Sequence, residues 1–127
     1  MISREDFESF MLRMELDYEE IGENLWIVDP ELSGRKSIVV SYSAPLVVLR
    51  SAVEPAPEGD AERLKLYSRL LEMNASELVH GSYGLEDGEI VLGDALELEN
   101  LDFSEFQASY ESLALALASH IDNLTTG

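Results

Sequence analysis

The sequence contains no cysteine, so it can form neither a disulfide framework nor a metal site built from thiolates. It also lacks any apolar run approaching the roughly 18 residues that a membrane-spanning helix needs. The segment Met1–Asp6 leads directly into mixed charge and shows no signal-peptide core. We therefore expect a cytoplasmic protein that does not enter a membrane.

Basic residues are scarce: 8 Lys and Arg stand against 26 Asp and Glu, which gives a net charge of −18. The last basic side chain is Arg69, and the sequence after it is acidic. Such a chain repels nucleic-acid phosphates and anionic lipids, so neither is an expected partner. Basic or amphipathic protein segments are attracted to it. The same charge also serves solubility alone, and composition leaves both explanations open.

Residues that could carry chemistry are few. His80 and His120 are the two histidines, and they fall on separate expected elements without the HExxH spacing of a zinc site. Residues 81–84 (GSYG) do not form the G-x-S-x-G elbow of a hydrolase. No phosphate-binding glycine pattern is present. The sequence therefore predicts no catalytic residue, no cofactor and no metal, and the protein is not expected to be an enzyme.

Apolar periodicity divides the chain into helices and strands of one domain, residues 1–127. Helices are expected to begin at Ser3, Asp60 and Asp102, each with a capping side chain. Asp87-Gly88 predicts a type I′ hairpin turn. The expected strands are Leu16–Ile21, Leu25–Val28, Ile38–Ser43, Leu46–Val53, Leu78–Leu85 and Glu89–Leu98.

Successive strands with helices set beside them predict an α+β fold with an antiparallel sheet and flanking helices. The C-terminal half contains a further pattern of apolar positions, an Asn and turn residues: 70–74 (LLEMN), 81–85 (GSYGL), 87–92 (DGEIVL), 96–98 (LEL) and 101–102 (LD). In this pattern the sequence resembles the CesT-type, Tir chaperone-like secretion chaperones and their YbjN-like relatives. The resemblance implies the order α-β-β-β-α-β-β-α, with Leu16–Ile21 as an additional short N-terminal strand.

The resemblance also implies a homodimer that binds an unfolded or extended segment of a partner protein. Carried over from the chaperones, the expected dimer interface is Leu64, Tyr67, Leu71, Val79 and Val91. The expected partner-binding residues are Phe7, Phe10, Met11, Leu25, Trp26 and Val28. The alternative for every one of them is an ordinary place in the core. Among them, Phe10 and Trp26 are expected to be exposed.

These observations favour a non-catalytic protein-binding domain, chaperone-like or adaptor, that holds a partner polypeptide. One alternative is a YbjN-like regulatory protein that acts through protein–protein contacts. Another is an acidic decoy that binds the basic groove of a nucleic-acid-binding protein. A decoy predicts strongly salt-dependent binding, whereas an apolar groove predicts weaker salt dependence.

Overall fold

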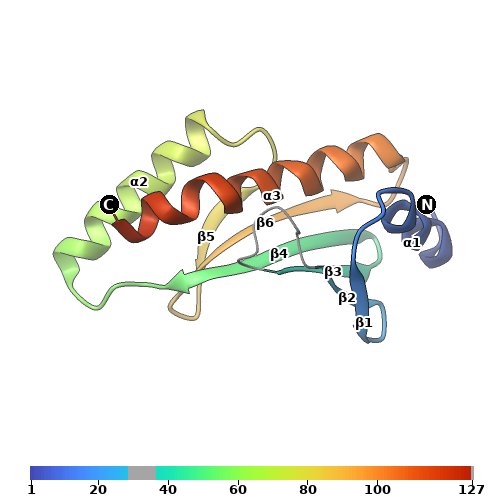
Figure 1. The fold of residues 1–127 in the computed structure, drawn as a ribbon, viewed down its shortest axis with the longest axis horizontal. Coiled ribbons are helices and arrows are strands. Elements are labelled where there is room, and N and C mark those ends of the chain that lie inside the picture. The colour runs from blue at the N-terminus through green and yellow to red at the C-terminus, as the bar shows by residue number, and fades with distance from the viewer. Residues whose placement is uncertain (29–36, 127) are drawn as a thin grey trace.

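The computed structural model describes residues 1–28 and 37–126, and their side chains as far as Ser119. In this part of the chain, helices and strands follow one another in the expected order (Figure 1). The elements are α1 (Arg4–Arg13), β1 (Tyr18–Gly22), β2 (Leu25–Val28), β3 (Ile38–Ser43), β4 (Leu46–Pro55), α2 (Asp60–Ser76), β5 (Ser82–Glu86), β6 (Glu89–Glu97) and α3 (Phe103–Thr126).

The described strands form one antiparallel sheet in the order β1-β2-β3-β4-β6-β5. The α+β prediction is therefore confirmed. Helix α3 runs along the sheet and contacts β4 and β6, while α1 packs on α3 near one end and α2 on β5 near the other (Figure 1). The described helices share one side of the sheet, so none of them lies over its second face, which we call the helix-free face.

The core lies between the sheet and the helices. Along β4, Val47 and Leu49 are fully buried, whereas the next residue, Arg50, is exposed on the opposite face of the sheet. This alternation follows from the two-residue repeat of a strand. Helix α3 contributes a row of buried side chains at helical spacing, which includes Phe106 and Leu113. Each such side chain contributes about 1.5–3 kcal/mol when it leaves water.

Two of the three predicted helix caps are confirmed. The Ser3 hydroxyl accepts a hydrogen bond from the Asp6 N–H at 3.1 Å, and the Asp102 carboxylate accepts one from the Glu105 N–H at 2.8 Å. The prediction for Asp60 is wrong, because it is the first helical residue of α2. Gly59 takes the cap position there and offers no side-chain acceptor.

The β5–β6 hairpin has the predicted turn. Asp87 and Gly88 have φ angles of 51° and 81°, the left-handed values that a type I′ turn requires. Strand β5, however, begins at Ser82 and not at Leu78. Gly81 interrupts the extended chain with a φ of 82°, and a Cβ there would lie 2.6 Å from the Leu113 side chain. The residues before Gly81 therefore form a connection and not a strand.

The buried phenol of Tyr83 in β5 should make stability sensitive to alkaline pH. Burial, and then the negative charge of Glu77, raises the pKa of Tyr83. Above about pH 10 the unfolded chain loses this proton while the folded chain keeps it, so the free energy of unfolding falls as pH rises. We expect Tyr83→Phe to reduce the steepness of that fall. Urea unfolding between about pH 8 and 11, followed by the fluorescence of Trp26, measures both slopes.

Tyr18 retains its own alkaline contribution in the variant, because burial and the nearby Glu8 raise its pKa as well. The comparison therefore concerns slopes and not absolute stabilities. Equal slopes for the wild type and Tyr83→Phe would contradict the assignment to Tyr83.

Candidate protein-binding surfaces

Helix α2 presents an apolar ridge to solvent. Leu66, Leu70 and Met73 turn inward, whereas Leu64 and Leu71 are 70% and 68% exposed. Positions seven residues apart share one face of a helix, so the two exposed leucines form a single ridge. Two apolar side chains exposed to this degree, two turns apart on one helix face, are a candidate interface.

The structure brings together only part of the predicted dimer set. Tyr67 lies on α2 and is half-buried, and Val79 follows in the connection after α2 with 82% exposure. Val91 instead lies on β6, on the sheet face that carries no helix. The set therefore falls on two separate surfaces.

The predicted partner-binding residues lie mainly in the core. The expected exposure of Phe10 and Trp26 is wrong, because they are 9% and 0% exposed. The Phe7 ring lies 4.9 Å from Phe106 and 5.9 Å from Trp26, which places the apolar face of α1 against α3 and β2. Phe7, Met11 and Val28 are also fully buried. Leu25 alone among the six is partly exposed.

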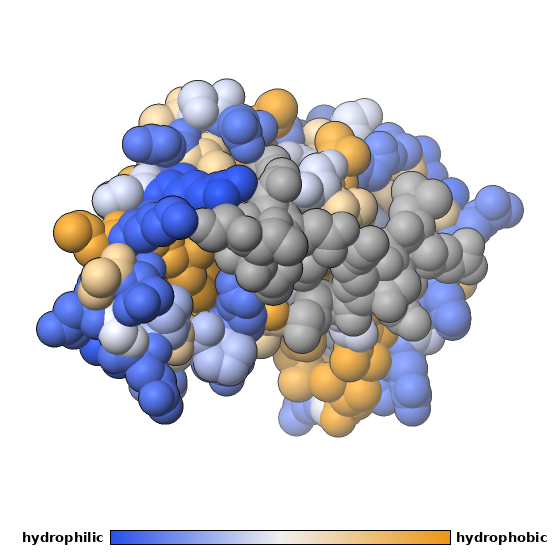
Figure 2. Space-filling view, turned by 60° about the vertical axis from the view of Figure 1, so that its left-hand side comes forward, coloured by the Kyte–Doolittle hydropathy of each residue, from blue (hydrophilic) through white to orange (hydrophobic). Residues whose placement is uncertain are grey.

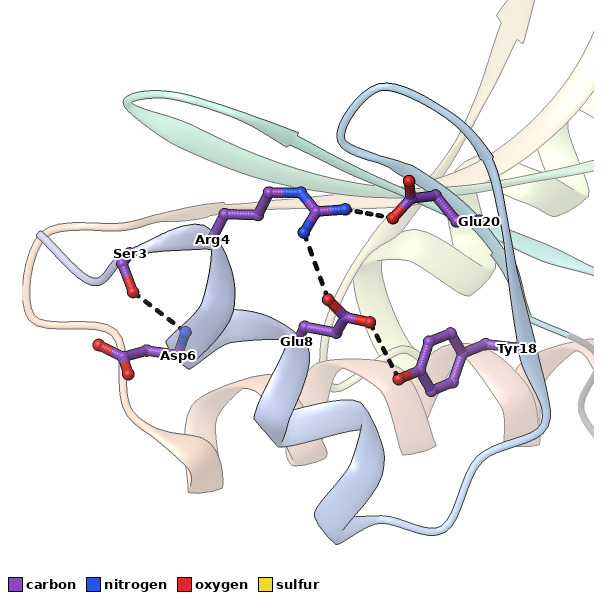
Figure 3. Close-up of polar contacts among 6 residues, drawn as sticks. All are labelled: Ser3, Arg4, Asp6, Glu8, Tyr18 and Glu20. Carbon is purple, nitrogen blue, oxygen red and sulfur yellow. Dashed lines mark hydrogen bonds and ion pairs between the residues drawn. The ribbon is translucent and has the colours of Figure 1, made fainter.

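A polar network fastens α1 over β1 (Figure 3). The Arg4 guanidinium donates to Glu8 at 3.3 Å and also to Glu20 of β1. Glu8 accepts a second hydrogen bond from the Tyr18 hydroxyl at 3.2 Å. The guanidinium lies over the Trp26 ring, 4.9 Å from its centre. These contacts cover the aromatic core beside α1 and hold α1 against β1 and β2.

The helix-free face of the sheet is hollowed. A hollow of about 600 Å³ lies over β3, β4 and the β5–β6 hairpin, and a second of about 460 Å³ adjoins it. Arg50 and Glu86 form an ion pair of 2.7 Å across this surface. The first hollow is lined by Val39, Ser41, Ser43, Val48, Arg50, Ala52, Glu86, Asp87, Glu89 and Val91.

The outer edge of β5 is occupied by a side chain of α2. The Asn74 amide nitrogen donates to the Tyr83 carbonyl at 3.2 Å, and the amide oxygen accepts from the Tyr83 N–H at 2.7 Å. The N–H and carbonyl of Tyr83 therefore both point toward α2. The Asn74 side chain pairs with both groups, as the backbone of a neighbouring strand would. The sequence motif contains Asn74 but gave no indication of this role.

The space-filling view, with the α2 end turned forward, shows apolar patches set in a mainly hydrophilic surface (Figure 2). Among the side chains that the structure describes, no group of three or more from His, Asp and Glu is arranged to hold a metal ion. His80 is held through its backbone, whose N–H donates to the Ser112 hydroxyl at 3.2 Å. The side chain of His120 lies outside the described ones. No helix in the described part is long and apolar enough to cross a membrane.

Comparison by sequence gives one family. The CesT_Tir_1 family model matches residues 3–126, which is nearly the whole chain. No curated protein matches the sequence.

Solved structures share the fold at low identity. A chain of the ExoU–SpcU complex from the Pseudomonas aeruginosa type III secretion system matches with a TM-score of 0.71 and 16% identity, over 91% of this chain and 94% of that one. YbjN from E. coli gives 0.69 and 12%, over 96% and 93%. The complex of the Yersinia pestis secretion chaperone SycH with a fragment of YscM2 gives 0.62 and 14%, over 91% and 99%.

The contact between Asn74 and β5 predicts that removing the amide weakens the fold locally. Asn74→Ala takes away the partner of the Tyr83 N–H and carbonyl, which should lower the free energy of unfolding by about 1–3 kcal/mol. The Tyr83 amide should also exchange with solvent at least ~10-fold faster. Denaturant titration and amide hydrogen exchange measure the two effects.

Ser76→Ala is the matched control on the same helix, because the Ser76 hydroxyl bonds only within α2, to the Glu72 carbonyl at 2.8 Å. It should change stability by less than about 0.5 kcal/mol. Unchanged protection of the Tyr83 amide in Asn74→Ala would show that the amide does not close this edge.

Proposed function

The chain belongs to the CesT_Tir_1 family, and we propose that it is a non-catalytic, chaperone-like protein that holds a partner polypeptide as a homodimer. The observation that carries the proposal is the apolar ridge of Leu64 and Leu71 on an otherwise anionic protein. A folded chain leaves two large apolar side chains this exposed at a cost in solubility, which a binding surface explains.

The charge on α2 favours self-association there. The helix carries as many basic as acidic side chains, although the whole chain has a net charge of −18. Two copies can therefore approach through α2 without net electrostatic repulsion between the two helices. In a two-fold interface every contact occurs twice, so the ridge of one subunit would pack on that of the other. The charged side chains of α2 are Asp60, Glu62, Arg63, Lys65, Arg69 and Glu72.

The order of the strands in the sheet supports partner binding at the edge formed by β1. Because Asn74 occupies the β5 edge, β1 is the sheet edge in the described chain at which a partner strand finds no such obstacle. An added strand gains main-chain hydrogen bonds regardless of its sequence. Leu25 on the neighbouring β2 is partly exposed and offers an apolar contact beside this edge. A comparable partner complex exists for SycH, which was solved with a YscM2 fragment.

Removal of the ridge should abolish the dimer. The wild type should sediment as a dimer at micromolar concentration, and Leu64→Glu/Leu71→Glu should sediment as a monomer with its secondary structure intact. Loss of two buried leucines from each subunit weakens association by at least ~100-fold. Analytical ultracentrifugation provides the measurement.

The control is Leu12→Glu, which makes the same change at a 62% exposed position on α1, near the other end of the sheet (Figure 1). It should remain dimeric. A monomeric wild type, or equal weakening by both variants, would remove the α2 dimer from the proposal.

Partner holding should be visible as protection of an extended segment. We expect a protein crosslinked to the chain in cells to form a stoichiometric complex with it after purification of both. A segment of the partner that protease cleaves readily in isolation should resist cleavage in the complex, because ordering on binding removes its accessible conformations. Size-exclusion chromatography and limited proteolysis test this. A complex in which no partner segment gains protection would contradict a chaperone-like role.

A further inference from the structure

We propose that the hollow on the helix-free face of the sheet docks an amphipathic helix of the partner, with its apolar side on the sheet and Lys or Arg residues along its flanks. This inference rests on the proposed function and specifies a surface and a chemistry for it. The surface is separate from α2 and from the sheet edge at β1. We refer to it below as the sheet hollow, defined by the ten residues that line the larger cavity.

The floor of the sheet hollow is apolar and only partly covered. It is formed by three half-buried valines from β3, β4 and β6, over which none of the described helices lies: Val39, Val48 and Val91. They lie on strands that are paired on both sides within the sheet. A segment placed here cannot gain backbone hydrogen bonds from those strands. A helix satisfies its own backbone groups and can pack through side chains alone, so the occupant is a helix and not an added strand.

Gly84 keeps the adjoining part of this surface open without serving the fold. A Cβ at Gly84 would meet nothing closer than the Val91 Cγ2 at 3.8 Å, and its φ lies outside the left-handed region. Gly93 differs, because a Cβ there would lie 2.9 Å from the Leu49 carbonyl oxygen. Glycine weakens a strand interior and commonly marks the close approach of another chain. The bare backbone at Gly84 therefore fits a surface that receives a partner.

The rim of the sheet hollow selects a basic partner. Glu86, Asp87 and Glu89 line one end, and Arg50 is the single basic residue among those that line it. Arg50 already pairs with Glu86 at 2.7 Å, so its charge is compensated. A second copy of this chain would bring the same acidic rim against this one. The local charge therefore disfavours self-association at the sheet hollow and favours flanking Lys or Arg residues on the partner.

The probe is a synthetic helical peptide of about 18 residues, with Leu along one face and Lys along the other. Two further peptides are a scrambled isomer of the same composition and a version with Glu in place of Lys. The full-length chain should bind the first peptide best, as measured by fluorescence anisotropy. The methyl resonances of Val39, Val48 and Val91 should shift on titration, which locates the contact.

Gly84→Phe should weaken peptide binding at least ~10-fold, because the ring fills the space beside Val91. Its unfolding midpoint should equal or exceed that of the wild type, since a strand accepts Phe better than Gly. Gly22→Phe is the matched control on β1, where a Cβ would make only ordinary contacts with Leu25 at 3.7 Å. It should leave peptide binding unchanged.

Glu89→Lys tests the same surface through an exposed side chain and remains informative even where Gly84→Phe fails to fold. It should weaken binding about threefold more than Glu111→Lys, the same change on the exposed side of α3. Equal binding by the scrambled peptide, unshifted Val methyls, or wild-type affinity in both Gly84→Phe and Glu89→Lys would overturn the inference.

The same variants separate this inference from the proposed function. Where the purified partner still forms its protected complex with Gly84→Phe but not with Gly22→Phe, the partner docks at β1, and the sheet hollow is rejected while the chaperone-like role stands. Where the wild type protects no partner segment, the chaperone-like role is rejected whatever the peptide does.

Discussion

The packing of α3 on β4 and β6 is the contact on which the other surfaces depend. Its buried row includes Phe106 and Leu117, and Phe106 also receives the ring of Phe7 from α1 at 4.9 Å. One helix layer thus gathers the aromatic core on a single side of the sheet. The consequence is a two-layer molecule in which the second sheet face stays open, with apolar side chains that no described helix covers.

The helix caps and the hairpin turn could mostly be predicted from the sequence, because they depend on residues that are neighbours in the chain. Ser3 and Asp102 cap helices within their own first turn, and Asp87-Gly88 sets its turn by its own φ angles. Asp60 shows the limit, since a good capping residue lies one position inside the helix that Gly59 begins. The order of helices and strands along the chain and the α+β class followed from apolar periodicity, which is also a short-range pattern.

The candidate site was harder to predict, because it depends on which elements meet. The apolar spacing around Phe10 is the same for a core face and for a binding face, and only the packing of α1 on α3 shows that it is core. Alternation along β6 separates Val91 from Leu92 but cannot show that one of the two sheet faces lacks a helix. The role of Asn74 needed the contact between α2 and β5, which joins residues nine positions apart in the chain.

The distribution of charge divides the two main surfaces by the kind of partner they can accept. On α2 the acidic and basic side chains balance in number, so an identical copy meets no net repulsion there. Around the sheet hollow the rim remains acidic even after Arg50 is paired with Glu86, so an identical copy is repelled there. Screening by salt weakens both effects, but apolar contacts at each surface persist. Self-association and partner capture can therefore proceed at the same time, each on the surface whose charge permits it.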